Sequence, residues 1–312
     1  MIIREINPKD TSAIIELLQL SLGESLLKKS TAIWDFKHLK NPFGPSHVLI
    51  AEQDGVLVGV RAFMQWRWQV EDEIWTSYRA VDTATHPKYQ GQGIFKKLTL
   101  RALDDVQARG DSFVFNTPNN QSRPGYLKMG WREVGKINVA LVPSILYSFD
   151  LLFPVTIMEN VITTKQLEAL CVLHNSHFQN KGVLFTPKSL DYLKWRYEEN
   201  LLQEYHIVST PDFYIAMYIK RHSFYKELRV VETIGSYSKE KHSQIRSSIV
   251  RYAFKKGCWL ITFDDKNLFK FRFFGPYGPK LTFRALTSKT NFIKKALSIK
   301  NWGYSIGDLE LF

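Results

Sequence analysis

Cysteine is scarce in this chain of 312 residues, which contains only Cys171 and Cys258. Two cysteines cannot build a disulfide framework or a cysteine-rich metal site. We therefore expect a protein of the reducing cytoplasm, with no metal centre. The chain is 45% hydrophobic, and its length and composition predict two globular domains with ample core.

Long apolar runs are also missing. The first ten residues, MIIREINPKD, carry charges too early for a secretory signal peptide. The most apolar stretch, residues 139–157, is interrupted by Pro143, Asp150 and Pro154, which disfavours a membrane-spanning helix. We expect a buried connector there, with contact to a membrane interface as the alternative.

Acidic residues are fewer than basic ones, 30 against 42, and the net charge is +12. Most of the excess lies late in the chain, with +3 over residues 1–143 and +9 over residues 144–312. A basic surface favours acidic partners such as nucleotide phosphates, anionic polysaccharide precursors, RNA or a membrane, although solubility and cofactor steering explain it equally well. No long run of lysine and arginine and no RNA-binding motif occurs, which disfavours nucleic acid.

Two common nucleotide-binding loops are absent. The chain has no Gly-x-x-x-x-Gly-Lys-Ser/Thr pattern, and a dinucleotide loop would require a third small residue near position 96, where a lysine stands. The chain does contain a predicted strand over residues 78–85, which ends at His86-Pro87, and a predicted amphipathic helix over residues 92–109.

The turn between that strand and that helix is Gln90-Gly91-Gln92-Gly93. Glycine lets a ligand approach the backbone, and the unpaired N–H groups and the dipole at a helix N-terminus attract anions. The turn is therefore a candidate pyrophosphate site. A plain strand-to-helix turn that needs two glycines is the alternative.

The run HPKYQGQGIFKKL (residues 86–98) resembles the acyl-CoA pyrophosphate loop of GNAT N-acetyltransferases, Gln/Arg-x-x-Gly-x-Gly/Ala. Gln90 and Gly93 match this pattern, whereas Phe95 stands where the family has glycine or alanine. A second block, NNQSRPGYLKMGW, resembles the family's Asn-x6-Tyr-x-x-x-Gly-Phe/Trp ending, with Asn119 and Tyr126 at its two defining positions. The two blocks occur in the family's order, and the resemblance covers residues 1–142.

The resemblance implies acetyl-CoA as co-substrate and direct transfer of its acetyl group to a primary amine. Tyr126 matches the position that protonates the leaving thiolate, which suits a phenol because the two groups have similar pKa values. Backbone N–H groups of the strand would polarise the thioester carbonyl. The cofactor-binding residues so implied are Thr83, Ala84, Thr85, Gln90, Gly91, Gln92, Gly93, Ile94, Phe95, Lys96, Asn119 and Ser122.

The general base that accepts a proton from the amine is less well defined. Asp82 on the strand and His86 at its end are the catalytic candidates that we put forward. Glu71 and Glu73 at a predicted hairpin, the C-terminal carboxylate of Phe312 and a water chain remain open.

The second half of the chain repeats the first half's order of elements. Residues 186–197 resemble residues 30–36, and predicted strands, a helix over residues 240–256 and a strand over residues 259–263 follow. At the place of the loop, the repeat has IGSYSKEKHSQ, which lacks Gln-x-x-Gly. We predict an α/β (α+β) protein of two GNAT-like domains, each a mixed, mostly antiparallel sheet flanked by helices. The predicted boundaries are 1–142 for the catalytic domain, 143–180 for a connector with a helix, and 181–312 for a degenerate, acceptor-binding or structural domain.

The predicted function is acetyl-CoA-dependent N-acetylation of the primary amine of a small or sugar-like acceptor. Anionic acceptors and amino sugars are among the candidates, and the identity of the acceptor stays open. Two alternatives remain open. A Fem-type aminoacyl transferase also pairs two such domains and uses charged tRNA, and the basic second half motivates it. A non-catalytic acyl-CoA-binding module would use the same loop without turnover.

Overall fold

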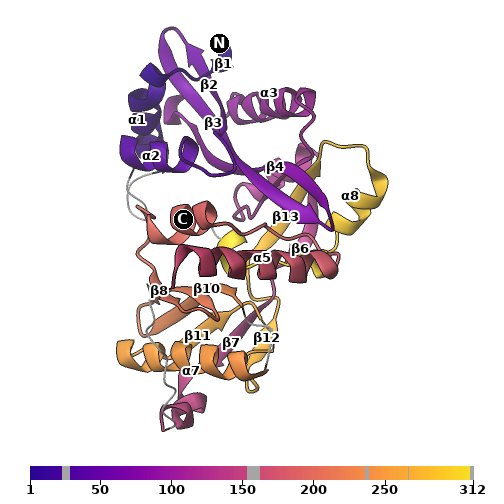
Figure 1. The fold of residues 1–312 in the computed structure, drawn as a ribbon. Coiled ribbons are helices and arrows are strands. Elements are labelled where there is room, and N and C mark those ends of the chain that lie inside the picture. The colour runs from indigo at the N-terminus through magenta and orange to yellow at the C-terminus, as the bar shows by residue number, and fades with distance from the viewer. Residues whose placement is uncertain (23–28, 153–161, 236–238, 266, 310–312) are drawn as a thin grey trace. The chain divides into compact units, whose positions relative to one another are not determined.

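The computed structural model describes residues 1–22, 29–152, 162–235, 239–265 and 267–309. The chain divides into two compact units, neither of which is contiguous in sequence (Figure 1). The first unit contains residues 1–69, 73–135 and 280–299, and the second contains residues 70–72, 136–279 and 300–312. This division differs from the predicted boundaries at residues 142 and 180, because strands far apart in sequence pair with one another.

The first unit is built on a seven-stranded sheet in the order β1-β2-β3-β4-β5-β13-β6. Pairs β1–β2, β2–β3 and β13–β5 are antiparallel, whereas β4 and β5 are parallel. Its strands are β1 (Ile2–Glu5), β2 (His47–Gln53), β3 (Val56–Val70), β4 (Glu73–Thr85), β5 (Phe113–Asn116), β6 (Arg132–Lys136) and β13 (Lys280–Ala285).

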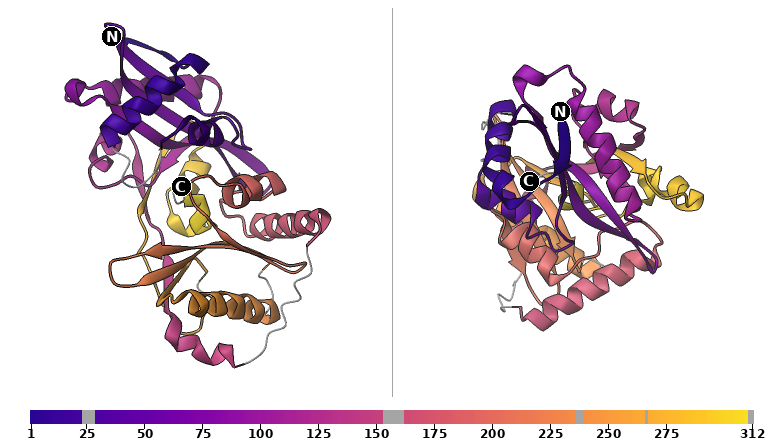
Figure 2. Two further views of the ribbon diagram at one scale, coloured as in Figure 1. Left: turned by 90° about the vertical axis from the view of Figure 1, so that its left-hand side faces the viewer. Right: turned by 90° about the horizontal axis from the view of Figure 1, so that it is seen from above.

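Helices cover both faces of this sheet. Helices α1 and α2 lie on one face and α3 on the other, as the right-hand view of Figure 2 shows. Gly59 in β3 permits the close approach of α3, because a Cβ at that position would lie 2.6 Å from Cγ2 of Ile94. Trp34 and Phe36 are buried, in agreement with the core role that is usual for such residues. The helices of the unit are η1 (Pro8–Asp10), α1 (Thr11–Leu22), α2 (Thr31–His38), η2 (Pro87–Tyr89), α3 (Ile94–Ala108), α4 (Arg123–Lys128) and α8 (Thr290–Ala296).

The second unit is built on a six-stranded sheet in the order β12-β7-β11-β10-β9-β8. Its strands are β7 (Val139–Pro143), β8 (His206–Ser209), β9 (Tyr214–Arg221), β10 (Lys226–Ile234), β11 (Leu260–Phe263) and β12 (Phe273–Gly275). Helices α5 and α7 lie on opposite sides of the sheet (Figure 1), and Leu228 and Val230 pack in one core with Ile245 and Ile249 of α7. The helices are η3 (Ser144–Leu151), α5 (Thr164–Asn180), α6 (Leu190–Leu193), η4 (Lys194–Glu198), α7 (Lys239–Lys256), η5 (Ile299–Asn301) and α9 (Ile306–Leu309).

The two halves of the chain have exchanged a strand. Strand β13 lies between β5 and β6 in the first sheet, and β7 lies between β11 and β12 in the second. The orders β4-β5-β13-β6 and β10-β11-β7-β12 are therefore equivalent, and each begins with a parallel pair. This equivalence fits the predicted internal repeat. It also corrects the assignment of residues 139–142 to the first domain and of residues 280–285 to the second.

The apolar stretch at residues 139–157 is only partly described. Its first part forms β7 and η3, while residues 153–157 lie outside the described residues. Among the described residues, we find no helix with the length and hydropathy needed to span a bilayer.

Candidate active site

The site begins where two parallel strands separate. Strands β4 and β5 pair only from Ser77 to Arg79, opposite Phe113 to Phe115. Strand β4 then continues to Thr85, while β5 ends at Asn116. Within this part of β4, which is unpaired on the β5 side only, Asp82 has a φ of 36°, a backbone conformation that is uncommon outside glycine and marks a local irregularity in the strand.

The predicted loop follows directly. Gly91 and Gly93 have φ values of 79° and 74°, so both adopt the left-handed conformation that glycine permits without strain. Residues 90–93 are all exposed, and Gly93 is the N-cap of α3. The N–H groups of residues 91–93 donate no hydrogen bond to any described residue. Free amides at a helix N-terminus, followed by the exposed side chains of Lys96 and Lys97, are suited to a diphosphate.

Tyr126 lies beside the first turn of α3. Its ring meets the ring of Phe95 edge to face, with 5.6 Å between the centroids. Gly125 makes room for this contact, because a Cβ there would lie 3.2 Å from Cε1 of Phe95. The phenylalanine that departs from the family pattern thus packs directly against the predicted catalytic tyrosine. Ile94 is buried in the core, so only its backbone is available to a ligand.

Arg61 of β3, to which the sequence assigned no place among the catalytic or cofactor residues, contacts Tyr126. Its Nη1 atom donates to the hydroxyl oxygen of Tyr126 over 2.8 Å and to Oγ1 of Thr83 over 2.7 Å. The side chain is completely buried, although a solvated or acceptor-lining sheet face is the usual place for arginines on such strands. A signal was present in the sequence: Arg61 is the single charge in the apolar run VLVGVRAFM.

The remaining predicted cofactor residues lie at the end of β4 and in the turn between β5 and α4. Ala84 is buried, and the carbonyl oxygen of Thr85 accepts a hydrogen bond from the hydroxyl of Ser21. Oδ1 of Asn119 accepts from the backbone N–H of Ser122 over 2.8 Å and from its hydroxyl over 2.9 Å, so these side chains shape the turn that precedes α4. Binding of pantetheine by Asn119 or Ser122 stays a prediction.

Comparisons with known proteins agree with this geometry. Residues 2–134 match the family model described as an acetyltransferase (GNAT) domain. The chain carries a GNAT acetyltransferase domain. A domain of this family supports transfer of an acyl group to an amine in general. No curated protein matches the sequence.

Several solved structures resemble this chain over most of its length, at identities that show the fold alone. A GCN5-related N-acetyltransferase from Anabaena variabilis ATCC 29413 is 13% identical, with a TM-score of 0.65, covering 92% of this chain and 73% of that one. A protein from Enterococcus faecalis V583, described as a probable N-acyltransferase, is 11% identical, with a TM-score of 0.68 and coverages of 93% and 73%. Eis1 from Mycobacterium abscessus is 13% identical, with a TM-score of 0.58 and coverages of 93% and 75%.

Within the GNAT domain, the surroundings of Asp82 argue against a role as general base. Its carboxylate accepts from Nζ of Lys37 over 2.5 Å and from Nε2 of His38 over 2.9 Å. Burial alone would raise the pKa of Asp82, but the Lys37 charge and the His38 hydrogen bond outweigh burial and hold the pKa far below its usual value. A carboxylate so stabilised is a poor proton acceptor, whereas it is well placed to fix the irregular part of β4.

The other base candidates are less constrained. Nδ1 of His86 accepts from the backbone N–H of Lys88, which leaves Nε2 as the atom available for proton transfer. Glu73 forms an ion pair with Lys289, and Glu71 lies in the hairpin turn with a φ of 51°. Phe312 lies outside the described residues. His86 as a base stays a prediction.

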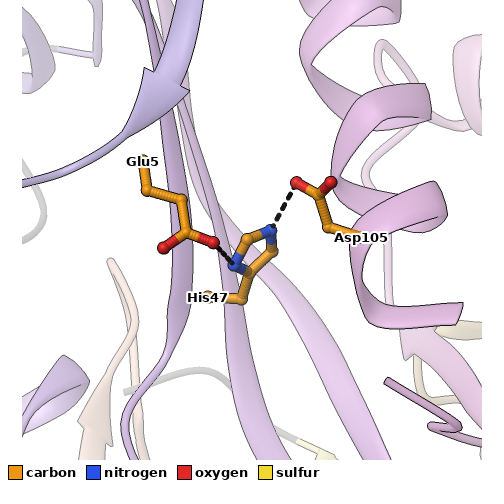
Figure 3. A group of neighbouring side chains, drawn as sticks. All are labelled: Glu5, His47 and Asp105. Carbon is orange, nitrogen blue, oxygen red and sulfur yellow. Dashed lines mark hydrogen bonds and ion pairs between the residues drawn. The ribbon is translucent and has the colours of Figure 1, made fainter. Parts of the chain in front are cut away.

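A cluster of potential metal ligands lies away from the loop, in the same unit. Glu5 (β1), His47 (β2) and Asp105 (α3) bring ligand atoms within 4.8 Å of one another (Figure 3). The two carboxylates contact opposite nitrogens of the ring, at 3.5 Å and 3.2 Å, so the ring cannot direct both contacts to one ion. Arg109 and Arg101 also bind Glu5 and Asp105. We interpret the cluster as an ion-pair network and not as a metal centre.

In the described part of the second unit, side chains occupy the position equivalent to this site. Its parallel strands β10 and β11 also pair over only three residues. Farther along β10, however, Glu232 binds Nζ of Lys188 over 2.7 Å, and the same ammonium binds Asp308 of α9 over 2.8 Å. Buried side chains thus cover the part of β10 that corresponds to the unpaired part of β4.

Proposed function

We propose that this chain is an acetyl-CoA-dependent N-acetyltransferase that acetylates the primary amine of a small acceptor by direct attack. One observation carries the proposal: the first turn of α3 serves both parts of the site. The backbone N–H groups of residues 91–93, which lead into this turn, are exposed and have no hydrogen-bond partner among the described residues. Phe95, in the turn itself, packs against Tyr126. A diphosphate on the loop and a sulfur beside the phenol would therefore be held by one rigid element.

In this proposal, the loop amides and Lys96 bind the diphosphate, and N–H groups of residues 83–85 polarise the thioester carbonyl. The amine nitrogen attacks the carbonyl carbon, the carbon–sulfur bond breaks, and Tyr126 gives its hydroxyl proton to the leaving sulfur. The proton that the amine loses goes to His86 or to water.

We assign the second unit a structural or acceptor-binding role, because ion pairs cover the position equivalent to the cofactor strand. The net charge of +9 over residues 144–312 favours an acceptor with anionic groups, and an amino sugar that carries such groups meets this condition. We also place the protein in the cytoplasm, where its two buried thiols, Cys171 and Cys258, would stay reduced. Transfer from charged tRNA would need no exposed glycine turn, so the loop argues against a Fem-type reaction.

The proposal is tested by calorimetry with acetyl-CoA, followed by assays of thiol release against pooled primary amines. We expect Tyr126→Phe to lower kcat about 100-fold or more, as the loss of a general acid does, and to change the Kd for acetyl-CoA less than about twofold. Tyr277→Phe, at an exposed tyrosine of the second unit, is the matched control and should behave as wild type. Absence of acetyl-CoA binding would contradict the proposal, and binding without thiol release for any amine would favour a non-catalytic module.

A further inference from the structure

The guanidinium of Arg61 is buried, with no counter-ion among the described residues. Its side chain is 0% exposed, and no described carboxylate forms an ion pair with it. Nη1 has two partners, the hydroxyls of Tyr126 and Thr83, whereas Nε and Nη2 have none. The rings of Phe63, Phe95 and Tyr126 lie 4.8, 5.7 and 5.3 Å from its central carbon.

This arrangement does not stabilise the fold. Buried polar groups without partners are destabilising, and a buried charge without a counter-ion is more so. The aromatic rings offset part of this cost, because a cation is attracted to the face of a ring. A side chain of similar length without charge would fill the same space among three aromatic rings at lower cost. An unfavourable group that persists at a catalytic position points to a function.

We infer that Arg61 is a positioning residue for Tyr126 and balances the negative charge that appears on its oxygen during transfer. The inference rests on the proposed function. Because Nη1 donates to the hydroxyl oxygen, the hydrogen of that hydroxyl points away from Arg61 and is free for the sulfur. The hydroxyl of Thr83 accepts from the same nitrogen and so ties Arg61 to the unpaired part of β4.

The proton balance of the reaction places a negative charge on the oxygen of Tyr126. When the carbon–sulfur bond breaks, its electron pair leaves on sulfur, and the Tyr126 O–H bond supplies the proton that completes the thiol. Tyr126 is then a phenolate beside the Arg61 guanidinium, the charge-assisted pair that Arg61 lacks in the resting site. The phenolate regains a proton derived from the attacking amine, directly or through water, so each cycle leaves both side chains unchanged.

The test replaces Arg61 by methionine, which keeps the volume and removes the charge. We expect kcat to fall about 100-fold, as the loss of one preorganised donor does in other enzymes, with the KM for acetyl-CoA changed less than about threefold. The melting temperature should stay the same or rise, because two unpaired N–H groups leave the core. Arg61→Lys keeps the charge and should restore part of kcat. Arg67→Met, at an exposed arginine of the same strand, is the matched control.

A double variant separates positioning from general damage. Arg61→Met added to Tyr126→Phe should lower kcat no further than Tyr126→Phe alone, because no phenol remains to be positioned. Additive losses would overturn the inference, and so would a melting temperature that falls by several degrees, which marks a structural arginine. Full activity of Arg61→Met in an active enzyme overturns this inference alone, whereas a wild-type protein that transfers no acetyl group to any amine overturns the proposed function together with it.

Discussion

The glycine at the N-terminus of α3 permits a sharp test of the loop. Gly93 has φ 74° and ψ 15°, and a Cβ built at this position meets no atom within 4 Å. Gly93→Ala is therefore free of collisions, and its cost is the backbone strain of a left-handed alanine, about 1–2 kcal/mol. The perturbation acts on the direction of the loop amides without altering the side-chain packing around them.

The strain can appear in two measurable places. If the variant loop keeps its native conformation, the strain lowers the free energy of unfolding by about 1–2 kcal/mol. If the loop relaxes instead, its amides turn away, and acetyl-CoA must restore them on binding. The Kd then rises by the equivalent factor of about 5–30.

Gly110 at the other end of α3 is the matched control. It has a φ of 84°, and a Cβ there also meets nothing within 4 Å, so Gly110→Ala carries the same strain at a distance from the loop. If its backbone stays native, each variant should lose stability in urea denaturation. If its backbone relaxes, each variant should keep its stability, and only Gly93→Ala should then weaken acetyl-CoA binding in calorimetry. A Gly93→Ala variant that keeps both wild-type stability and wild-type affinity would refute an anion site at these amides.

Two further predictions concern stability. Lys188→Met should lower the free energy of unfolding by about 3–5 kcal/mol in urea denaturation, because it leaves Glu232 and Asp308 buried without their shared cation. Lys194→Met, at an exposed site, is the control and should change this free energy by less than about 0.5 kcal/mol. Burial lowers the pKa of His38 and His47 and lowers that of His174 well below its usual value, so the unfolded chain binds more protons at these rings than the folded protein does once the pH falls below about 6.5. The stability that these rings contribute is present above that pH and is lost as the pH falls below it, by up to about 1.4 kcal/mol per pH unit for each ring. Denaturation midpoints that are equal at pH 7 and pH 5.5 would contradict this account.

Local patterns predicted the elements of the first unit well. The predicted strand over residues 78–85 ends with β4 at Thr85, and the predicted helix over residues 92–109 agrees with α3 to within two residues at each end, because both signals lie in neighbouring residues. The glycine turn before α3 was readable for the same reason. Its positive φ values and its exposure are what a Gly-x-Gly turn at a helix start requires.

Long-range pairing could not be predicted in the same way. Strand β13 takes its place beside β5 across more than a hundred and sixty residues of chain, and its sequence KLTFRA reads as an ordinary strand. The burial of Arg61 likewise depends on the rings that surround it, including those of Phe95 and Tyr126, which lie elsewhere in the sequence. Asp82 was proposed as a base from its place on β4, but its pKa is set by Lys37 and His38 of helix α2, which lies far from β4 in the sequence.

The exchanged strands give a structural reason for the two halves of the chain to occur together. Without β13, the first sheet would expose the paired edge of β5 and leave β6 without its neighbour, and without β7 the second sheet would lose the strand between β11 and β12. Unpaired backbone groups at a broken sheet are costly and invite aggregation. Neither half therefore holds a complete sheet of its own, so the degenerate half contributes to the fold of the GNAT domain whether or not it binds a ligand. Loss of β13, which the second half of the chain supplies to the first sheet, would separate β5 from β6 and so disrupt the site at Tyr126, which lies between these strands in sequence.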